Sequence, residues 1–138
     1  MSNWEDKVCL ITGACSGIGW AFVQSFAQKG AKCLLVDINH QLGEQRIQEL
    51  IGKYGLGRFE YMKADVTSHQ NFEGAFEKCL ELFGRIDVLV NSAGILSEIN
   101  WETELQINLH VSVYFLIVLI ICNKPSKKLC KPKSTYAN

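Results

Sequence analysis

The sequence predicts an α/β fold in which strands and helices alternate around a parallel sheet. Short, continuous apolar runs recur four times, which is typical of strands that are buried on both faces. Amphipathic patterns with helical spacing separate these runs. Alternation of this kind selects right-handed connections and helices on both faces of the sheet. We therefore expect three layers and the strand order 3-2-1-4.

The first apolar run leads into a glycine-rich turn. Residues 7–12 are predicted as a buried strand, and a helical pattern begins after the turn. Glycines in such a strand–turn–helix unit allow a sharp turn and close approach of the backbone to a diphosphate, and the helix N-terminus offers free N–H groups. The pattern predicts half of a Rossmann-type dinucleotide-binding unit, although glycines alone would also fit an ordinary tight turn. The turn reads Thr12-Gly13-Ala14-Cys15-Ser16-Gly17-Ile18-Gly19.

The helix after this turn is expected over residues 18–29, and Gly30 stops it at a position that glycine favours. The second strand is expected over residues 32–36 and ends at Asp37. The residues expected on the inner face of the helix are Ile18, Ala21, Phe22, Phe26 and Ala27.

Two further helices and two further strands complete the predicted sheet. A helix over residues 41–51 is ended by Gly52, and a third strand covers residues 59–64. A helix over residues 70–83 has the clearest amphipathic pattern, whose aromatic stripe we interpret as core packing, and residues 86–90 form the fourth strand. The inward-facing residues are expected to be Leu42, Ile47, Leu50 and Ile51 in the first of these helices, and Phe72, Ala75, Phe76, Cys79, Leu80 and Phe83 in the second.

Charge divides the chain into two parts. The formal net charge of all 138 residues is zero, so bulk charge favours neither nucleic acid nor acidic partners. Residues 1–122 carry a net charge of −5, whereas residues 123–138 contain five Lys and no acidic residue. We expect a partial dinucleotide-binding domain over residues 1–122 and a basic, disordered tail over residues 123–138.

An apolar run over residues 111–122 precedes this tail, after a helix that is expected over residues 101–109. Twelve residues are fewer than the roughly 20 that span a bilayer. We therefore favour a helical extension or a strand beside the fourth strand over a membrane anchor. The first apolar run is too short for a signal peptide, so the expected compartment is the cytoplasm.

The six cysteines show no spacing typical of metal ligands, and no metal site is expected. Cys9, Cys33 and Cys79 fall on apolar faces, where reduced cysteine packs as a small hydrophobic residue. Cys15, in the glycine-rich turn, is the cysteine that we expect to oxidise most readily.

Asp37 suggests which dinucleotide the chain binds. It lies eighteen residues after Gly19, at the end of the second strand. A carboxylate there can accept hydrogen bonds from both hydroxyls of an adenosine ribose and would repel a 2′-phosphate. By itself Asp37 would also fit the start of a turn, but beside the glycine-rich turn it predicts NAD rather than NADP.

The glycine spacing, with Thr12 before it, resembles the Thr-Gly-x3-Gly-x-Gly signature of the short-chain dehydrogenase/reductase family. The resemblance covers residues 5 to about 110. It implies that Asp65 and Val66 contact adenine, and that Asn108 holds a water in the proton relay of the family. Residues 91–94 match the family's Asn-Asn-Ala-Gly, with Ser in second place; the first residue is expected to tie the strand end to its neighbours and the last to pass near the nicotinamide-side ribose. The candidate cofactor-binding residues are Gly13, Cys15, Ser16, Gly17, Ile18, Gly19, Asp37, Ile38, Asp65, Val66, Asn91, Ser92, Ala93 and Gly94, and the catalytic candidate is Asn108.

Within the family, residues 100–102 and 105–109 resemble the NAD-dependent 15-hydroxyprostaglandin dehydrogenase branch, and insect-type alcohol dehydrogenases share parts of the pattern. The family oxidises secondary alcohols to ketones with a Ser, a Tyr and a Lys four residues after that Tyr. No Tyr of this sequence has Lys four residues later, and the resemblance stops just after Asn108. We therefore expect a truncated chain, with the second half of its sheet incomplete, that does not turn over alone. The alternatives are an inactive protein that pairs with a full-length relative, and a membrane-attached fragment.

Overall fold

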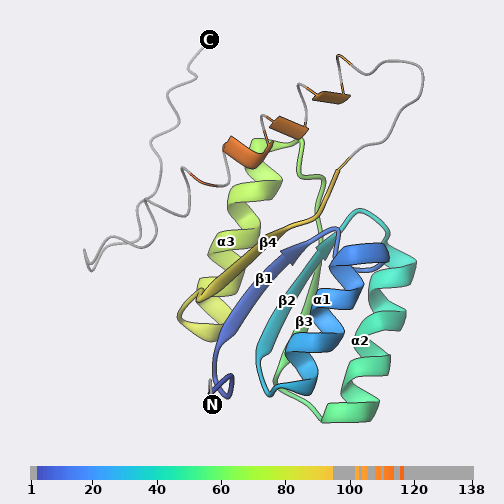
Figure 1. The fold of residues 1–138 in the computed structure, drawn as a ribbon, viewed down its shortest axis with the longest axis vertical. Coiled ribbons are helices and arrows are strands. Elements are labelled where there is room, and N and C mark those ends of the chain that lie inside the picture. Colours follow the sequence, from blue (N-terminus) through green and yellow to red (C-terminus); the bar gives the residue numbers. More distant parts are fainter. Residues whose placement is uncertain are drawn as a thin grey trace.

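The computed structural model describes residues 3–94 together with residues 102, 104, 105, 108, 109, 111–113 and 116. Within residues 3–94, strands and helices alternate from beginning to end, as predicted (Figure 1). In chain order they are β1 (Val8–Thr12), α1 (Gly17–Gln28), β2 (Lys32–Asp37), α2 (His40–Tyr54), β3 (Phe59–Lys63), α3 (His69–Phe83) and β4 (Val88–Asn91).

The strands form one parallel sheet in the order β3-β2-β1-β4, which confirms the predicted order. The order reverses at β1, because the chain first adds strands on one side of β1 and then places β4 on the other. In register, Thr12 lies opposite Val36 on one side and Asn91 on the other. The carboxyl ends of these three strands therefore meet at one edge of the sheet, where open α/β sheets bind ligands.

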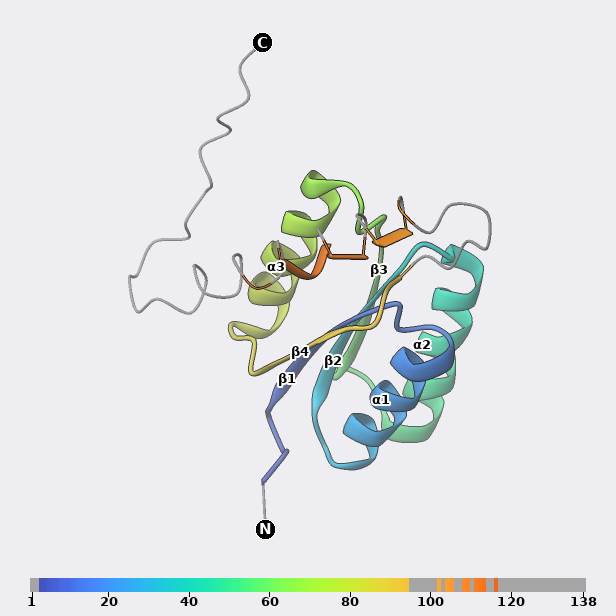
Figure 2. The ribbon, with the colours of Figure 1, turned by 45° about the horizontal axis from the view of Figure 1, so that its top comes forward.

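Two helices cover one face of the sheet and one covers the other. Figure 2 shows the sheet between α3 and the pair α1 and α2. Successive side chains of a strand point to opposite faces. In β1, Cys9 and Ile11 belong to the core cluster with α1 and α2, whereas Val8 and Leu10 belong to the cluster with α3. All four side chains are buried, which explains why β1 is a continuous apolar run.

The face of α1 that packs on the sheet differs from the prediction. Ile18 is 72% exposed and Phe22 is 42% exposed, and Ala21 is also exposed, so these three residues do not lie on the inner face. The buried residues of α1 are Gly19, Trp20, Val23, Phe26 and Ala27. This face is set by Gly19, because a Cβ there would clash with the Gly13 carbonyl oxygen. This contact turns Ile18 away from the core.

Caps fix the ends of the other helices. The Asn39 side chain accepts a hydrogen bond from the Leu42 N–H at the start of α2, and Ser68 caps α3 in the same way. The prediction that Gly52 ends α2 is wrong, since the helix continues to Tyr54 and ends at Gly55, whose φ is 89°. A Cβ at Gly52 would meet no atom within 4 Å, so this glycine lies on the open surface of α2. The helix continues through it without a break.

The inward faces of α2 and α3 agree with the prediction in their main members. Ile47 and Leu50 are buried in α2, and Leu42 and Ile51 are half-buried. In α3 the buried residues are Phe72, Ala75, Phe76 and Cys79, while Leu80 and Phe83 are half-buried.

The described residues between 102 and 116 are helical. This agrees with the predicted helix over residues 101–109 and with its extension, and it excludes a strand at residues 111–113 and 116. Val111 is buried in the cluster with α3. Within the described part of the chain, no helix is both long and apolar enough to cross a membrane. The predicted tail over residues 123–138 lies outside the described residues.

Candidate functional site

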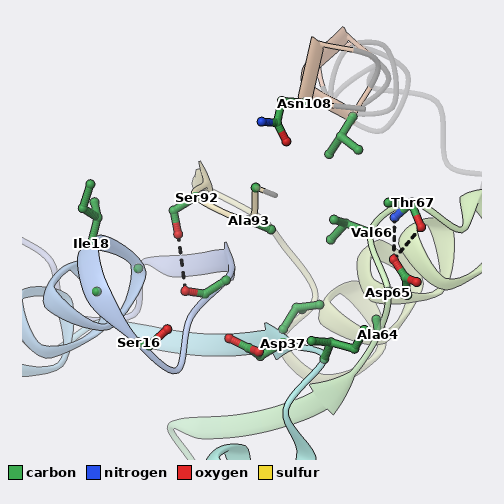
Figure 3. Close-up of a pocket in the computed structure, with 17 residues that line it drawn as sticks. Ser16, Ile18, Asp37, Ala64, Asp65, Val66, Thr67, Ser92, Ala93 and Asn108 are labelled. Carbon is green, nitrogen blue, oxygen red and sulfur yellow. Dashed lines mark hydrogen bonds between the residues drawn. The ribbon is translucent and has the colours of Figure 1, made fainter. Parts of the chain in front are cut away.

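A pocket of about 940 Å³ opens at the carboxyl ends of the four strands (Figure 3). It lies where the strand order reverses, between the turn after β1 and the segment after β4. The predicted site residues that line it are Gly13, Ser16, Gly17, Ile18, Gly19, Asp37, Ile38, Asp65, Val66, Ser92, Ala93, Gly94 and Asn108. The predicted residues Cys15 and Asn91 are absent from this lining.

Two glycines of the glycine-rich turn have a positive φ, but one is closely packed and the other faces open space. Gly13 has a φ of 60°, and a Cβ there would lie 2.8 Å from the Ala93 nitrogen, so the segment after β4 packs directly on this glycine. Gly17 has a φ of 54°, but a Cβ there would meet nothing within 4 Å. Gly17 therefore faces open space in the pocket at the N-terminus of α1, where free N–H groups favour an anion.

Asp37 is held in a fixed orientation at the end of β2. Its carboxylate accepts hydrogen bonds from the Cys15 N–H and from the Asn39 N–H, each at 3.0 Å. The Tyr61 hydroxyl donates to the Asp37 carbonyl oxygen, also at 3.0 Å. A carboxylate has about four acceptor positions, so two protein donors leave capacity for a ligand hydroxyl on the pocket side. The first of these contacts also joins the end of β2 to the glycine-rich turn.

Asp65 is held by a tight local turn. Its Oδ1 accepts from the Thr67 hydroxyl at 2.6 Å and from the Thr67 N–H at 2.9 Å, as the dashed lines in Figure 3 show. These hydrogen bonds lower the pKa of Asp65, the hydroxyl contributing most. Asp65 is therefore ionised at neutral pH and presents a fixed carboxylate beside Val66.

The ends of β1 and β4 are joined through Thr12, a buried polar residue. Its hydroxyl donates to Asn91 Oδ1 at 3.1 Å and accepts from the Ala93 N–H at 3.3 Å. The Ser92 hydroxyl donates to the Thr12 carbonyl oxygen at 2.6 Å. The prediction that Asn91 ties the strand end to its neighbours is confirmed. Sequence reasoning missed the role of Thr12, whose signal was a polar residue at the end of an otherwise apolar strand.

A helical segment approaches the pocket from the β4 side. The Asn91 amide donates to the Ser112 hydroxyl at 3.0 Å, and that hydroxyl donates to the Asn108 carbonyl oxygen at 2.9 Å. A Cβ at Gly94 would lie 3.5 Å from Asn108 Oδ1, an ordinary van der Waals distance, so Gly94 and Asn108 lie side by side at the pocket. In Figure 3, Asn108 lies across the pocket from Asp37.

The structure contradicts the expectation that Cys15 oxidises readily. Its side chain is fully buried, and burial raises the pKa of this thiol to about 12, with the nearby Asp37 carboxylate adding to the rise. The thiolate is the reactive form, and it is strongly disfavoured here. Cys15 contributes its backbone to the site rather than its sulfur.

Four residues of the pocket were not predicted: Val36, Ala64, Thr67 and Val111. Thr67 could have been found from its position two residues after Asp65, which is typical of a side-chain-to-backbone turn. Among the described residues that line the pocket, the ionisable side chains are those of Asp37 and Asp65. The described lining can bind hydroxyl groups and a diphosphate, but it offers no acid–base group suited to hydride transfer.

The sheet order and the position of the pocket define a Rossmann-type fold of the kind that binds nucleotides. The sequence model of the short chain dehydrogenase family matches residues 7–123. The chain belongs to this family.

Curated relatives include the 15-hydroxyprostaglandin dehydrogenases [NAD(+)] of Macaca fascicularis and Homo sapiens, which are 45% and 44% identical over 105 residues. The alignment covers 76% of this chain and 40% of each of those proteins. A 3beta-hydroxysteroid dehydrogenase 2 from Eggerthella lenta is 33% identical over 117 residues, which cover 78% of this chain and 44% of that protein. The chain thus spans less than half the length of these relatives.

Solved structures of the family share the fold. A glucose/ribitol dehydrogenase-type member from Brucella melitensis is 30% identical with a TM-score of 0.76, and the match covers 86% of this chain and 52% of that one. A member from Burkholderia phymatum in complex with NAD is 25% identical with a TM-score of 0.76, and the match covers 88% and 45% of the two chains.

Proposed function

We propose that this chain is the NAD(H)-binding portion of a dehydrogenase. The observation that carries the proposal is the Asp37 carboxylate, fixed by the Cys15 N–H at the end of β2 and lining the pocket. Such a carboxylate accepts hydrogen bonds from both hydroxyls of an adenosine ribose and repels the 2′-phosphate of NADP.

The rest of the pocket supports the same orientation of the cofactor. The diphosphate would lie at Gly17 and the N-terminus of α1, where a Cβ at Gly17 would meet no atom within 4 Å. The adenine lies beside Asp65 and Val66. The nicotinamide-side ribose extends toward Gly94 and Asn108, at the β4 end of the pocket. The two 15-hydroxyprostaglandin dehydrogenases reported above are named as NAD(+) enzymes, which agrees with this choice of dinucleotide.

The reaction that we propose for a full-length protein of this type is oxidation of a secondary alcohol to a ketone, with a substrate similar to a 15-hydroxyprostaglandin. Bound NAD would supply the hydride acceptor. The 138 residues contain no Tyr followed four residues later by Lys, and Asn108 is the only residue of the family's catalytic set that they supply. We therefore propose that these 138 residues bind the cofactor but do not by themselves catalyse the reaction. We place it in the cytoplasm, because its described cysteines are buried and free.

Calorimetric titration of the 138-residue chain with NAD and with NADP tests the proposal. We expect NAD to bind at least about tenfold more tightly, because Asp37 repels the 2′-phosphate. Equal affinities, or no binding of either dinucleotide, would contradict the proposal. Release of NADH with a 15-hydroxyprostaglandin as the alcohol would contradict the absence of turnover.

A second candidate function is pairing with a full-length relative as an inactive subunit. Four apolar residues with helical spacing are exposed by 50–60%: Leu105, Leu109, Val113 and Leu116. An apolar stripe of this kind is typical of a contact between proteins. Mixing the chain with a 15-hydroxyprostaglandin dehydrogenase should then give a mixed oligomer in size-exclusion chromatography with light scattering. It should also reduce the activity of that dehydrogenase. If both proteins elute unchanged, this candidate is wrong.

A further inference from the structure

The Arg46 side chain of α2 reaches the glycine-rich turn. Arg46 Nε donates a hydrogen bond to the Cys15 carbonyl oxygen at 3.1 Å. The guanidinium carbon also lies 4.3 Å from the ring centre of Trp20, in the first turns of α1. We propose that Arg46, which does not line the pocket, is a positioning residue that fixes the diphosphate-binding turn from outside it. The inference rests on the proposed binding of NAD(H).

The first argument is that the backbone of Cys15 is held on both sides. Its N–H donates to the Asp37 carboxylate, and its carbonyl oxygen accepts from Arg46. One contact ties the turn to the end of β2 and the other ties it to α2. Ser16 and Gly17, which line the pocket, follow immediately. With Cys15 fixed at both its N–H and its carbonyl group, the following peptide groups keep their direction toward the place of the diphosphate.

The second argument is the fit of the guanidinium group. It is planar, so its flat face can stack on the Trp20 ring while an N–H in the same plane points at the carbonyl oxygen. Trp20 is buried, and the Arg46 side chain is 27% exposed. Lys carries the same charge but lacks the planar donor group, so Lys could not make both contacts. Arg46 therefore links α1, α2 and the turn, and only arginine has the geometry to do so.

The competing interpretation is that Arg46 only forms a surface ion pair. Its Nη1 lies 3.1 Å from Glu49 Oε2, one turn later in α2, and the Glu49 side chain is half-exposed. Exposed pairs with this spacing contribute little to helix stability. Glu49→Gln removes the ion pair and leaves the contacts with Cys15 and Trp20 in place. It is the matched control.

The test uses the 138-residue chain and the variants Arg46→Gln, Arg46→Lys and Glu49→Gln. The first readout is amide hydrogen exchange of residues 14–17 without ligand. The second is the Kd for NAD, ADP and adenosine. We expect faster exchange of these amides in both Arg46 variants, and a Kd for NAD and ADP raised about tenfold, as for the loss of a charge-assisted hydrogen bond. The Kd for adenosine, which has no phosphate, should stay within about twofold, and Glu49→Gln should resemble the unmodified chain.

The outcomes separate this inference from the proposed function. If the unmodified chain binds neither NAD nor ADP, the proposed function fails, and unchanged exchange at residues 14–17 in the Arg46 variants would then overturn the inference as well. If NAD binds but the Arg46 variants bind it equally well, the inference alone is wrong. An equal loss for adenosine and ADP would also overturn it, because it would indicate general destabilisation. Circular dichroism identifies a variant that fails to fold, and the remaining Arg46 variant then decides.

Discussion

The two ends of the pocket differ in the sequence separation of the hydrogen bonds that hold them. At the β2–β3 end, Asp37 is bonded to the N–H of Asn39 and Asp65 is bonded to Thr67, each two residues away. At the β4 end, Thr12 is bonded to Asn91, which is 79 residues away. A turn between near neighbours needs only a short segment of the chain to be ordered. A contact between distant residues needs the whole sheet to be assembled. The carboxylate end thus combines local turns with a bond from the Cys15 N–H to Asp37, 22 residues away, whereas the bond between Thr12 and Asn91 spans most of the described fold.

The largest effect is expected at the glycine-rich turn after β1, the strand that lies between β2 and β4 in the sheet. Gly19→Val places side-chain atoms against the Gly13 carbonyl oxygen and the Ser92 hydroxyl. Because the Gly13 carbonyl group belongs to packed backbone that cannot easily move, we expect a loss of about 3 kcal/mol in the free energy of unfolding. Urea unfolding followed by circular dichroism measures this.

The control for that variant is Gly17→Ala, because a Cβ there meets no atom and only the φ of 54° opposes it. The expected cost is about 1–2 kcal/mol. Equal losses at Gly17 and Gly19 would show that the contact across the turn does not matter.

At the carboxylate end, Asp37→Asn should change ligand preference more than stability. The variant loses the charge that repels a 2′-phosphate and one acceptor for the ribose hydroxyls. We expect the Kd for NAD to rise about tenfold and the preference for NAD over NADP to disappear. Competition between the two dinucleotides in a fluorescence titration measures this. Unchanged preference would show that Asp37 does not face the ribose.

One substitution made at both ends sharpens the comparison. Thr12→Val leaves the Asn91 oxygen and the Ala93 N–H without their partner in a buried place, which should cost about 1–3 kcal/mol. Thr67→Val removes a hydroxyl bonded to Asp65 on the surface and should cost less than about 0.5 kcal/mol. Thermal unfolding of both variants measures the two losses of stability, which can then be compared. A larger loss at Thr67 would show that the local turn contributes more to stability than the long-range bond.

The same difference explains what could be predicted from the sequence. The strand order and Asp37 followed from short apolar runs and from the spacing to Gly19, which are local patterns. The partners of Thr12 and Arg46 could not be predicted, because both side chains contact residues that only the folded sheet brings near. The burial of Cys15 was missed for a related reason. A sequence does not show which way a turn residue points, and here the side chain points into the core.

The smallest effect concerns pH, and it separates the two threonines again. Hydrogen bonds from Thr67 lower the pKa of Asp65 in the folded chain below its ordinary value. A folded-state pKa below the unfolded value means that the ionised carboxylate stabilises the fold above about pH 3.9, the ordinary pKa of Asp. This contribution is lost as the pH falls through the lower, folded-state pKa.

In the Thr67→Val variant, stability should therefore fall slightly less steeply below pH 4 than in the unmodified chain. The Thr12→Val variant, which touches no titrating group in this turn, should keep the original slope. Urea midpoints measured between pH 2.5 and pH 6, together with the pKa of Asp65 from NMR, test this, and identical slopes in all three proteins would show that the turn does not stabilise the carboxylate.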